Sequence, residues 1–413
     1  MLNKDNVREL AYVVTVDEIR PIAGRDRVEC AVVGGWTIMV RKGQFKPGDV
    51  GIYFEIDSQV PAKEPFMFLE AKHFKIKTQK YKTPDGQFWS QGLLMGADDF
   101  GWTVATSCDE NEVKAIVDSD GEFHYANDID GSRFMTQLLG VTYAVAEDNT
   151  RKANSVDKYK KMAQRNGKLF AHQPFRWLMR RDWGKKLLFV FFGKKKDKKT
   201  GWPEWVKKTD EERVQNMPWI LQNKDPWIAT EKIDGTSTTF TMKRNKHNKF
   251  DFYICSRNVV FDKPDKQCFY DSNVYIEMAE KYDVENVLRQ ILENRSDLEW
   301  VTLQGETYGA GVQKRDYSLP GHDFMGFNFI TSAGGRWNSE EAAKLMESFG
   351  IPWVPIVDDA FILPDTVEEL LNIATGKSVV DGGMREGLVF RSQDGAQSFK
   401  AVSNEFLMKF HQG

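Results

Sequence analysis

The sequence contains few of the side chains that build metal centres and disulfide frameworks. Its 413 residues include four cysteines and six histidines, and the cysteines are Cys30, Cys108, Cys255 and Cys268. No two cysteines have C-x-x-C spacing, and no two histidines have H-x-x-x-H or H-E-x-x-H spacing. Zinc sites and secreted disulfide scaffolds normally show such spacings. We therefore expect neither a zinc centre nor a disulfide framework.

Long hydrophobic runs are also missing. The sequence has no stretch of 18 uncharged apolar residues, and its first residues, "MLNKDNVREL", lack the apolar segment of a signal peptide. The expectation is a cytoplasmic protein without membrane contact. Hydrophobic residues make up 41% of the chain and aromatic residues 13%, which is enough to build the cores of two or three domains.

Acidic residues are scarce in one part of the chain, although the net charge of the whole is only -3. Residues 151 to 208 hold 19 Lys and Arg against four Asp and Glu, a local net charge of +15. Four tryptophans are interspersed with these charges: Trp177, Trp183, Trp202 and Trp205. Cations beside aromatic rings suit phosphates and unstacked bases, so this stretch is a candidate RNA-binding segment. A solvated connector between domains remains the alternative.

Residues 8 to 97 read as a series of short β segments separated by Gly, Pro and Asp. Short strands without intervening helical patterns suggest a small barrel of the oligonucleotide/oligosaccharide-binding (OB) type, with a generic β-sandwich as the alternative. Residues 101 to 150 are acidic and irregular, and the sequence does not place them. We expect an all-β OB-like barrel domain over residues 1–125, a basic and aromatic-rich connector over 126–200, and an α+β domain over 201–413.

The C-terminal half alternates helical and strand patterns. A Thr209-x-x-Glu212 capping box predicts a helix beginning near Asp210. Apolar residues spaced three and four apart predict further helices at 273–294, 339–349 and 366–374. Strands are predicted in "WVTLQGETYG" (300–309), "HDFMGFNFI" (322–330), "EGLVFRS" (386–392) and "SFKAV" (398–402).

Within this half, the stretch "TEKIDGTSTTF" (230–240) places a lysine in a strand pattern. Asp234 follows Lys232 by two residues and so faces the same side of a strand, and Gly235 permits a sharp turn or a close approach to the backbone. This arrangement suits a lysine that reacts with a phosphate. An exposed strand lysine is the simpler alternative, and "K-x-D-G" alone is a common string.

Five further motifs follow in order: "CSRN" (255–258), "LQGETYG" (303–309), "FMGFNF" (324–329), "EGLVFRS" (386–392) and "SFKAV" (398–402). Together with "EKIDG", this ordered series resembles the motifs of ATP-dependent RNA ligases in the covalent nucleotidyltransferase superfamily. The resemblance is to the Rnl2/Naegleria type, and it extends from "KKTDEERVQN" (207–216) to Lys409. The α+β domain over 201–413 is therefore expected to be a nucleotidyltransferase domain that adenylylates itself.

The resemblance implies a role for each motif. Lys232 would be the nucleophile that attacks the α-phosphorus of ATP, with Glu231, Asp234 and Gly235 beside it in the nucleotide site. An ammonium group cannot attack, so Lys400 and a bound Mg²⁺ (or Mn²⁺) are the candidates that would lower the pKa of Lys232.

Other positions would hold the metal and the nucleotide. Glu306 and Glu386 would face the metal and the nucleotide, since hard carboxylate oxygens suit Mg²⁺. Arg257 would contact the ribose and later the RNA end, Phe327 would stack on adenine, and Arg213 would reach the triphosphate. For Arg257 an ordinary surface ion pair is the alternative, for Phe327 a plain core position, and for Arg213 a structural role.

One position departs from the resemblance. The final motif of these ligases commonly has two lysines separated by one residue, whereas this chain reads Lys400-Ala401-Val402. The second positive charge is missing, and Lys409 lies too far along the chain to be its obvious substitute.

The domain order separates members of the superfamily. DNA ligases and capping guanylyltransferases carry an OB domain after the nucleotidyltransferase domain, whereas here the OB-like segment comes first. The expected function is therefore an ATP-dependent RNA ligase, monomeric, that joins RNA with 5′-phosphate and 3′-hydroxyl ends through a lysyl-AMP intermediate. Two alternatives stay open: an RNA-binding or repair accessory protein with weak or no ligase activity, and a capping-type enzyme that uses GTP.

Overall fold

The computed structural model describes residues 1–4, 7–106, 113–127, 132–143, 202–257, 259–261 and 273–411, and the single residues His172, Phe175, Leu178, Arg181 and Leu188. The lysine run at 194–199, Trp177 and Trp183 lie outside the described residues, so the predicted RNA-binding segment is not tested. Contacts divide the chain into two compact units, residues 1–144 with 203–412, and residues 145–202.

The N-terminal part is all-β, as predicted. One antiparallel sheet has the order β1-β5-β10, with β1 at Ala11–Thr15, β5 at Val50–Phe54 and β10 at Leu93–Met95. A second has the order β2-β3-β4, with β2 at Glu18–Pro21, β3 at Val28–Val33 and β4 at Trp36–Arg41. Strand β5 is buried along its whole length, because apolar clusters cover it on both faces.

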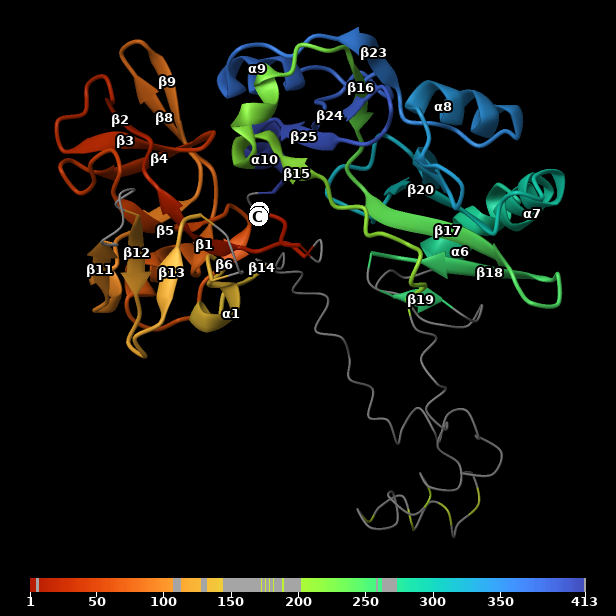
Figure 1. Ribbon diagram of the computed structural model, residues 1–413, viewed down its shortest axis with the longest axis horizontal. Helices are drawn as coiled ribbons and strands as arrows, with labels where there is room; N and C mark the ends of the chain where they lie inside the picture. Colours follow the sequence, from red (N-terminus) through yellow and green to blue (C-terminus); the bar gives the residue numbers. More distant parts are fainter. Residues whose placement is uncertain are drawn as a thin grey trace. The chain divides into compact units, whose positions relative to one another are not determined.

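Shorter elements join these sheets. They are β6 (Ser58–Gln59), the 3₁₀ helix η1 (Phe66–Lys72), β7 (Lys75–Ile76) and the hairpin β8–β9 (Gln79–Thr83 and Gly86–Ser90). Figure 1 shows the hairpin β8–β9 in orange next to β4.

Residues 101 to 143, which the sequence did not place, fold onto the same part. Strands β11 (Thr103–Thr106), β12 (Lys114–Val117) and β13 (Phe123–Tyr125) form an antiparallel sheet. Helix α1 (Thr136–Leu139) packs its Leu139 into the cluster that holds Phe54, and β14 (Thr142–Tyr143) pairs with β6. The expected boundary at residue 125 therefore falls inside this part of the chain.

The C-terminal part contains two sheets. A five-stranded sheet has the order β15-β25-β24-β16-β23, which correspond to Glu212–Arg213, Ser398–Val402, Gly387–Ser392, Trp227–Lys232 and Ile356–Phe361. A six-stranded antiparallel sheet has the order β19-β18-β17-β20-β21-β22, at Val260–Phe261, Phe250–Cys255, Thr236–Arg244, Trp300–Gly309, His322–Thr331 and Gly335–Arg336. The chain crosses from one sheet to the other between β16 and β17, at Ile233-Asp234-Gly235. The "KIDG" stretch is thus the connection between the sheets.

Helices cover these sheets. Helices α6 (Val274–Lys281), α7 (Val284–Asn294) and α8 (Ser339–Ser348) pack on the six-stranded sheet, and α9 (Val367–Ala374) packs on β24 and β25. Helix α10 (Asn404–Phe410) follows β25 directly (Figure 1). The helices predicted at 339–349 and 366–374 are confirmed, as are the strands predicted in this half.

One helix prediction was wrong, and another helical range is divided. The helical pattern at 273–294 is confirmed as two helices, α6 and α7, which are separated at Asp283, whose φ of 45° lies in the left-handed region. No α-helix begins near Asp210: Glu212 and Arg213 form β15 on the edge of β25, and the 3₁₀ helices η3 (Val214–Asn216) and η4 (Pro218–Gln222) follow. The capping-box side chains have other partners, since the Thr209 hydroxyl bonds the Ser237 hydroxyl at 2.5 Å and Glu212 accepts from the Asn216 amide at 2.8 Å.

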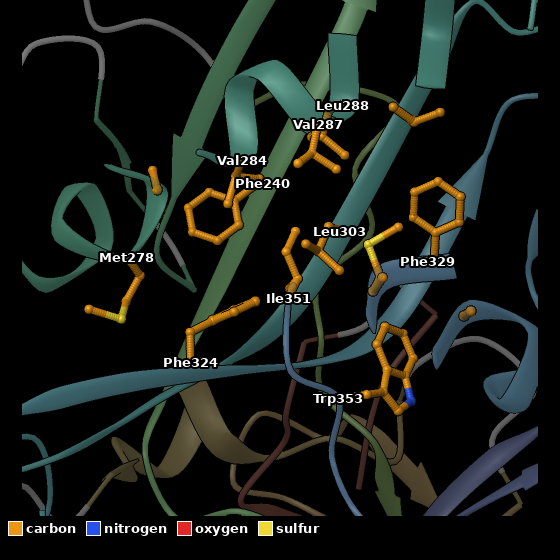
Figure 2. Close-up of a cluster of buried hydrophobic side chains, with 14 of the residues drawn as sticks. Phe240, Met278, Val284, Val287, Leu288, Leu303, Phe324, Phe329, Ile351 and Trp353 are labelled. Atoms are coloured by element: carbon orange, nitrogen blue, oxygen red, sulfur yellow. The ribbon is translucent and has the colours of Figure 1, made fainter. Parts of the chain in front are cut away.

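The largest apolar cluster lies between α6, α7 and α8 and the six-stranded sheet. Figure 2 shows Phe240, Leu303, Phe324 and Phe329 from the sheet meeting Val284, Val287 and Leu288 of α7. Phe240, Leu303, Phe324 and Phe329 have no exposed area. Burial of such side chains contributes about 1.5 to 3 kcal/mol each, which fixes the sheet whose edges carry the candidate site.

A buried polar network connects the first part of the chain with the segment after β15. The Glu55 carboxylate, 1% exposed, accepts hydrogen bonds from Arg8 at 3.1 Å, from the Tyr12 hydroxyl at 3.1 Å and from the Asn216 amide at 2.9 Å, and it also pairs with the Met1 amine. Burial alone would raise the pKa of Glu55. The Met1 amine and Arg8 instead hold this pKa well below its usual range.

We expect Glu55→Gln to lower the free energy of unfolding by about 3 kcal/mol, because it leaves the buried Arg8 guanidinium without its counter-charge. A carboxyl whose pKa is lowered by folding contributes stability above its unfolded pKa of about 4.3, and this contribution is lost as the pH falls toward the folded value. Thermal unfolding at pH 7 and at acid pH measures both effects. Glu70→Gln, at an exposed position, is the matched control. Equal midpoints for Glu55→Gln and Glu70→Gln at pH 7 would contradict the role given to this network.

Candidate active site

A cavity of about 340 Å³ is lined by residues from both sheets of the C-terminal part. All ten site residues predicted from the sequence line it: Arg213, Glu231, Lys232, Asp234, Gly235, Arg257, Glu306, Phe327, Glu386 and Lys400. They come from positions up to 187 residues apart in the chain. The fold therefore brings the separate motifs to one place.

Lys232 is the last residue of β16, and strand pairing sets its neighbour. Because Lys232 pairs with Gly387 of β24, the residue before that glycine, Glu386, lies next to the lysine. The Lys232 Nζ donates a hydrogen bond to Glu386 Oε2 at 2.8 Å. The lysine side chain is 24% exposed and Glu386 8%, so this pair lies at the wall of the cavity with the amine accessible.

Three carboxylates set the charge around this amine. Burial would lower the pKa of Lys232, but Glu386, Glu306 and Asp234 together raise it. Burial and the neighbouring carboxylates in turn raise the pKa of Glu306 to about 8 and raise that of Glu386, against the opposing effect of Lys232. In the ligand-free protein the pKa of Lys232 is therefore raised, because the three carboxylates outweigh the effect of burial. Whether Lys400 and a bound metal ion lower this pKa when ATP is present stays a prediction.

A group of cations lies on the other side of Lys232. Strand β15 runs parallel to β25 and places Arg213 beside Lys400. The Arg213 Nη2 donates to Asp57 Oδ2 at 3.4 Å. Burial lowers the pKa of Lys400 well below its usual range, and the charges of Arg8, Arg213 and Lys232 lower it further against the effect of Asp210. Such a concentration of positive charge is stabilised by an anion.

The segment that connects the two sheets, at Asp234 and Gly235, packs closely against β20. A Cβ on Gly235 would lie 2.3 Å from the Thr307 carbonyl oxygen and 2.8 Å from Glu306 Cγ, so only glycine allows β20 to bring Glu306 this close to Lys232. Asp234 is 5% exposed, and its Oδ2 has no hydrogen-bond partner among the described residues. Glu231 accepts a hydrogen bond from the Val379 amide at 2.7 Å.

The remaining predicted residues line other walls. Arg257 pairs with Asp210 and lies 5.8 Å from the centre of the Tyr143 ring. Phe327, on β21, is partly buried against the main apolar cluster, and the guanidinium of Arg391 lies 5.7 Å from the centre of its ring. Phe327 thus borders both the core and the cavity, and its stacking on adenine stays a prediction.

Sequence reasoning missed several lining residues. They include Asp210 and Glu211 before β15, Val354, Val389 and Arg391 near Phe327, and His411 after α10. Arg391 lies within the quoted motif "EGLVFRS", and its 2% exposure together with bonds to Thr230 and Asn328 makes it a fixed part of the wall. His411 carries no motif, and only the path of α10 brings it to the cavity.

The carboxylates provide oxygen ligands, but not a complete metal cage. Among the described residues no group of three or more His, Cys, Asp or Glu side chains is placed to hold a metal ion. Mg²⁺ usually keeps several waters and is bound through one or two carboxylates plus substrate phosphates, so Glu306 and Glu386 fit this type of site. The raised pKa values of both carboxyls show that a cation at this place would be favourable.

An all-β part precedes a two-sheet domain whose cavity holds Lys232 among carboxylates and cations, which is the arrangement expected of a nucleotidyltransferase. Comparison with known proteins identifies both parts. Residues 225–410 match the RNA ligase family, and residues 10–96 match an OB-fold domain family. A search of curated proteins found no match.

The solved structures extend this result to nearly the whole chain. The Naegleria gruberi RNA ligase with pyrophosphate is 26% identical over 98% of this chain and 100% of that chain, with a TM-score of 0.69. Two variants of the same ligase, one with ATP and Mn and one with AMP and Mn, are 26% identical with TM-scores of 0.67 over the same shares. The chain is therefore an ATP-dependent RNA ligase with an RNA ligase domain at residues 225–410 and an N-terminal OB-fold domain at residues 10–96, and it is similar to the Naegleria gruberi ligase over nearly its whole length. No described helix has the length and apolar character needed to cross a membrane.

Proposed function

We propose that this protein joins RNA ends with a 5′-phosphate and a 3′-hydroxyl, as an RNA ligase (ATP), and that Lys232 carries the covalent AMP. The observation that supports this assignment most strongly is the Lys232–Glu386 contact of 2.8 Å in a cavity that also contains Glu306, Lys400 and Arg213. A lysine on a solvent-exposed strand would not need these carboxylates and cations around it. An accessory protein that only binds RNA would not need this cluster of side chains either.

In the first step the neutral Lys232 amine attacks the α-phosphorus of ATP and forms a P–N bond. The P–O bond to the β-phosphate breaks, pyrophosphate leaves with the electron pair, and the amine loses a proton. The raised pKa of Lys232 means that the amine must give up a proton before it attacks. Lys400 and Arg213 lie where they can bind the negative charge of the phosphates during this step.

Glu306 and Glu386 are the residues that would hold Mg²⁺ or Mn²⁺. The ion would supply positive charge at the phosphates and draw the carboxylates' charge away from the Lys232 amine. In its absence Glu386 accepts the hydrogen bond from Lys232 and fixes the direction of the amine.

The base would lie at the opposite wall. Phe327, Val354 and Val389 form an apolar and aromatic surface there. This surface suits stacking of a purine, and Arg257 is close enough to the cations to contact ribose or an RNA end.

In the second step an oxygen of the RNA 5′-phosphate attacks the α-phosphorus, and the P–N bond breaks so that Lys232 regains its proton. In the third step the 3′-hydroxyl oxygen attacks the 5′-phosphorus, AMP leaves with the bridging oxygen, and the hydroxyl proton is released. The OB fold and the basic segment at 151–208 would hold the RNA strands during both steps. We further propose that the protein is a monomer located in the cytoplasm. We also propose three parts with boundaries near residues 125 and 200, except that residues 132–143 belong to the first domain.

The test incubates the protein with Mg²⁺ and either α-labelled ATP or α-labelled GTP, and then adds RNA with a 5′-phosphate and a 3′-hydroxyl. We expect label on the protein from ATP alone, and its loss with sealing of the RNA when the ends are added. Label from GTP alone would establish the capping alternative. RNA binding without label from either nucleotide would establish the accessory-protein alternative.

A further inference from the structure

The missing second lysine of the final motif has a structural explanation at Val402. Val402 is 3% exposed and belongs to the apolar cluster that contains Tyr53, Leu94 and Leu407. A lysine at this position would have to bury its charge in that cluster, which is costly without a partner. Val402 therefore contributes to an apolar core that β25 shares with α10 and the OB fold.

The chain after Val402 turns back toward the cavity. Ser403 caps α10 by accepting a hydrogen bond from the Phe406 amide at 3.3 Å, and the helix ends at Phe410. His411 follows as the C-terminal cap, with its amide bonded to the Leu407 carbonyl at 3.0 Å. Its ring lies 5.8 Å from that of Phe406, so the helix fixes the direction of the imidazole.

The imidazole lies at the wall of the cavity, beside Asp234. His411 lines the cavity, and its Nε2 is 3.7 Å from Asp234 Oδ1, two residues from the nucleophile. The other oxygen of Asp234 is buried without a hydrogen-bond partner among the described residues, so the carboxylate is not already neutralised elsewhere. The side chain of His411 is 34% exposed, which leaves its ring accessible to a ligand.

The charges that face His411 favour its protonated form. Partial burial would lower its pKa, but the Asp234 carboxylate, Glu386 and Asp57 raise it. The second basic residue nearby, Lys409, lies 5.0 Å from the centre of the Phe410 ring and does not line the cavity. Of these two basic residues, His411 is thus the one that lines the same cavity as Lys232.

We propose that His411 is a phosphate-binding residue of the adenylylation site, and that it supplies from α10 the positive charge that Val402 cannot. This inference rests on the proposed function, because it assigns His411 to the polyphosphate of ATP and to the pyrophosphate that leaves. His411 forms no covalent bond in the step. It contributes a charged N–H to the departing phosphates, while Asp234 holds the ring in place.

The experiment compares His411→Ala, His411→Gln and His411→Lys with Lys409→Ala as the control. Single-turnover formation of the AMP adduct is followed at several ATP concentrations with Mg²⁺ in excess. We expect His411→Ala and His411→Gln to slow the step by about 10- to 100-fold, and His411→Lys to retain most of the rate because lysine restores the charge. Lys409→Ala should react as the wild type does.

Two further readouts separate phosphate binding from a structural role. The reverse reaction, in which inorganic pyrophosphate removes AMP from the adenylylated protein, passes through the same transition state and should slow in His411→Ala by a similar factor. Sealing of RNA that already carries a 5′-adenylate involves no pyrophosphate and should change less than about threefold. Thermal midpoints of the variants show that each is folded.

The possible results distinguish this inference from the proposed function. A wild-type protein that forms no adduct would overturn the proposed function itself. If the wild type forms the adduct and His411→Ala forms it equally fast, then His411 is not in the site. If all three substitutions slow adenylylation and sealing of pre-adenylated RNA alike, His411 acts by holding Asp234, and the phosphate role is wrong.

Discussion

Lys232→Ala is expected to abolish the covalent AMP adduct, with a loss of more than about 10⁴-fold in the rate of adenylylation. The alanine has no atom that can form the P–N bond, and no second lysine takes the position opposite Glu386 among the described residues, since Lys400 lies on a different strand beside Arg213. The measurement is the intact mass of the protein after incubation with ATP and Mg²⁺, in which the wild type gains one AMP.

Two companion variants make this result specific. Lys232→Arg keeps a positive charge for the ion pair with Glu386, but a guanidinium is not deprotonated in proteins, so it should also form no adduct. Lys243→Ala changes a lysine of β17 that lies 4.6 Å from the Trp205 ring and does not line the cavity, so its adduct should form normally. An adduct that persists in a folded Lys232→Ala protein would refute the assignment of the nucleophile.

Lys400→Ala is expected to produce the second largest effect, a fall in the single-turnover rate of adenylylation by about 10³-fold, or to below detection. Burial lowers the pKa of the Lys400 amine, and the positive charges of Arg8, Arg213 and Lys232 lower it further. When the phosphates of ATP enter the site, these positive side chains attract their negative charge. Removal of Lys400 takes away a charge that Val402, being apolar, does not replace.

The rate is measured from pH 6 to 9 at saturating ATP, with Lys246→Ala, in an exposed loop, as the control. Lys400→Ala should remain slow across this range, because no change of pH restores the missing cation. A Lys400→Ala protein with the wild-type rate would mean that "SFKAV" is not the final motif of the site. Comparison with the His411 variants then shows how much Lys400 and His411 each contribute to the rate of adenylylation.

Much of the domain layout can be predicted from local patterns. The helices at 339–349 and 366–374 follow from hydrophobic periodicity, since each buries one regular face, and the short strands of residues 8–97 follow from apolar segments separated by Gly, Pro and Asp. The helix expected near Asp210 shows the limit of such patterns. Its capping residues bond Ser237 and Asn216 instead, because pairing of β15 with β25 competes for the same backbone.

By itself the sequence predicted which lysine, carboxylates and arginines would share one site, because the ordered motifs resemble those of RNA ligases, and the structure places these residues around one cavity. Only the tertiary structure showed in which direction the pKa values of Lys232 and Lys400 are shifted, and only it added His411 to the residues that line the site. Whether Lys232 or Lys400 has the lowered pKa depends on distances between strands that are far apart in the chain. His411 could not be found from its spacing, since it reaches Asp234 through the turn of a helix whose packing against Val402 no local pattern encodes.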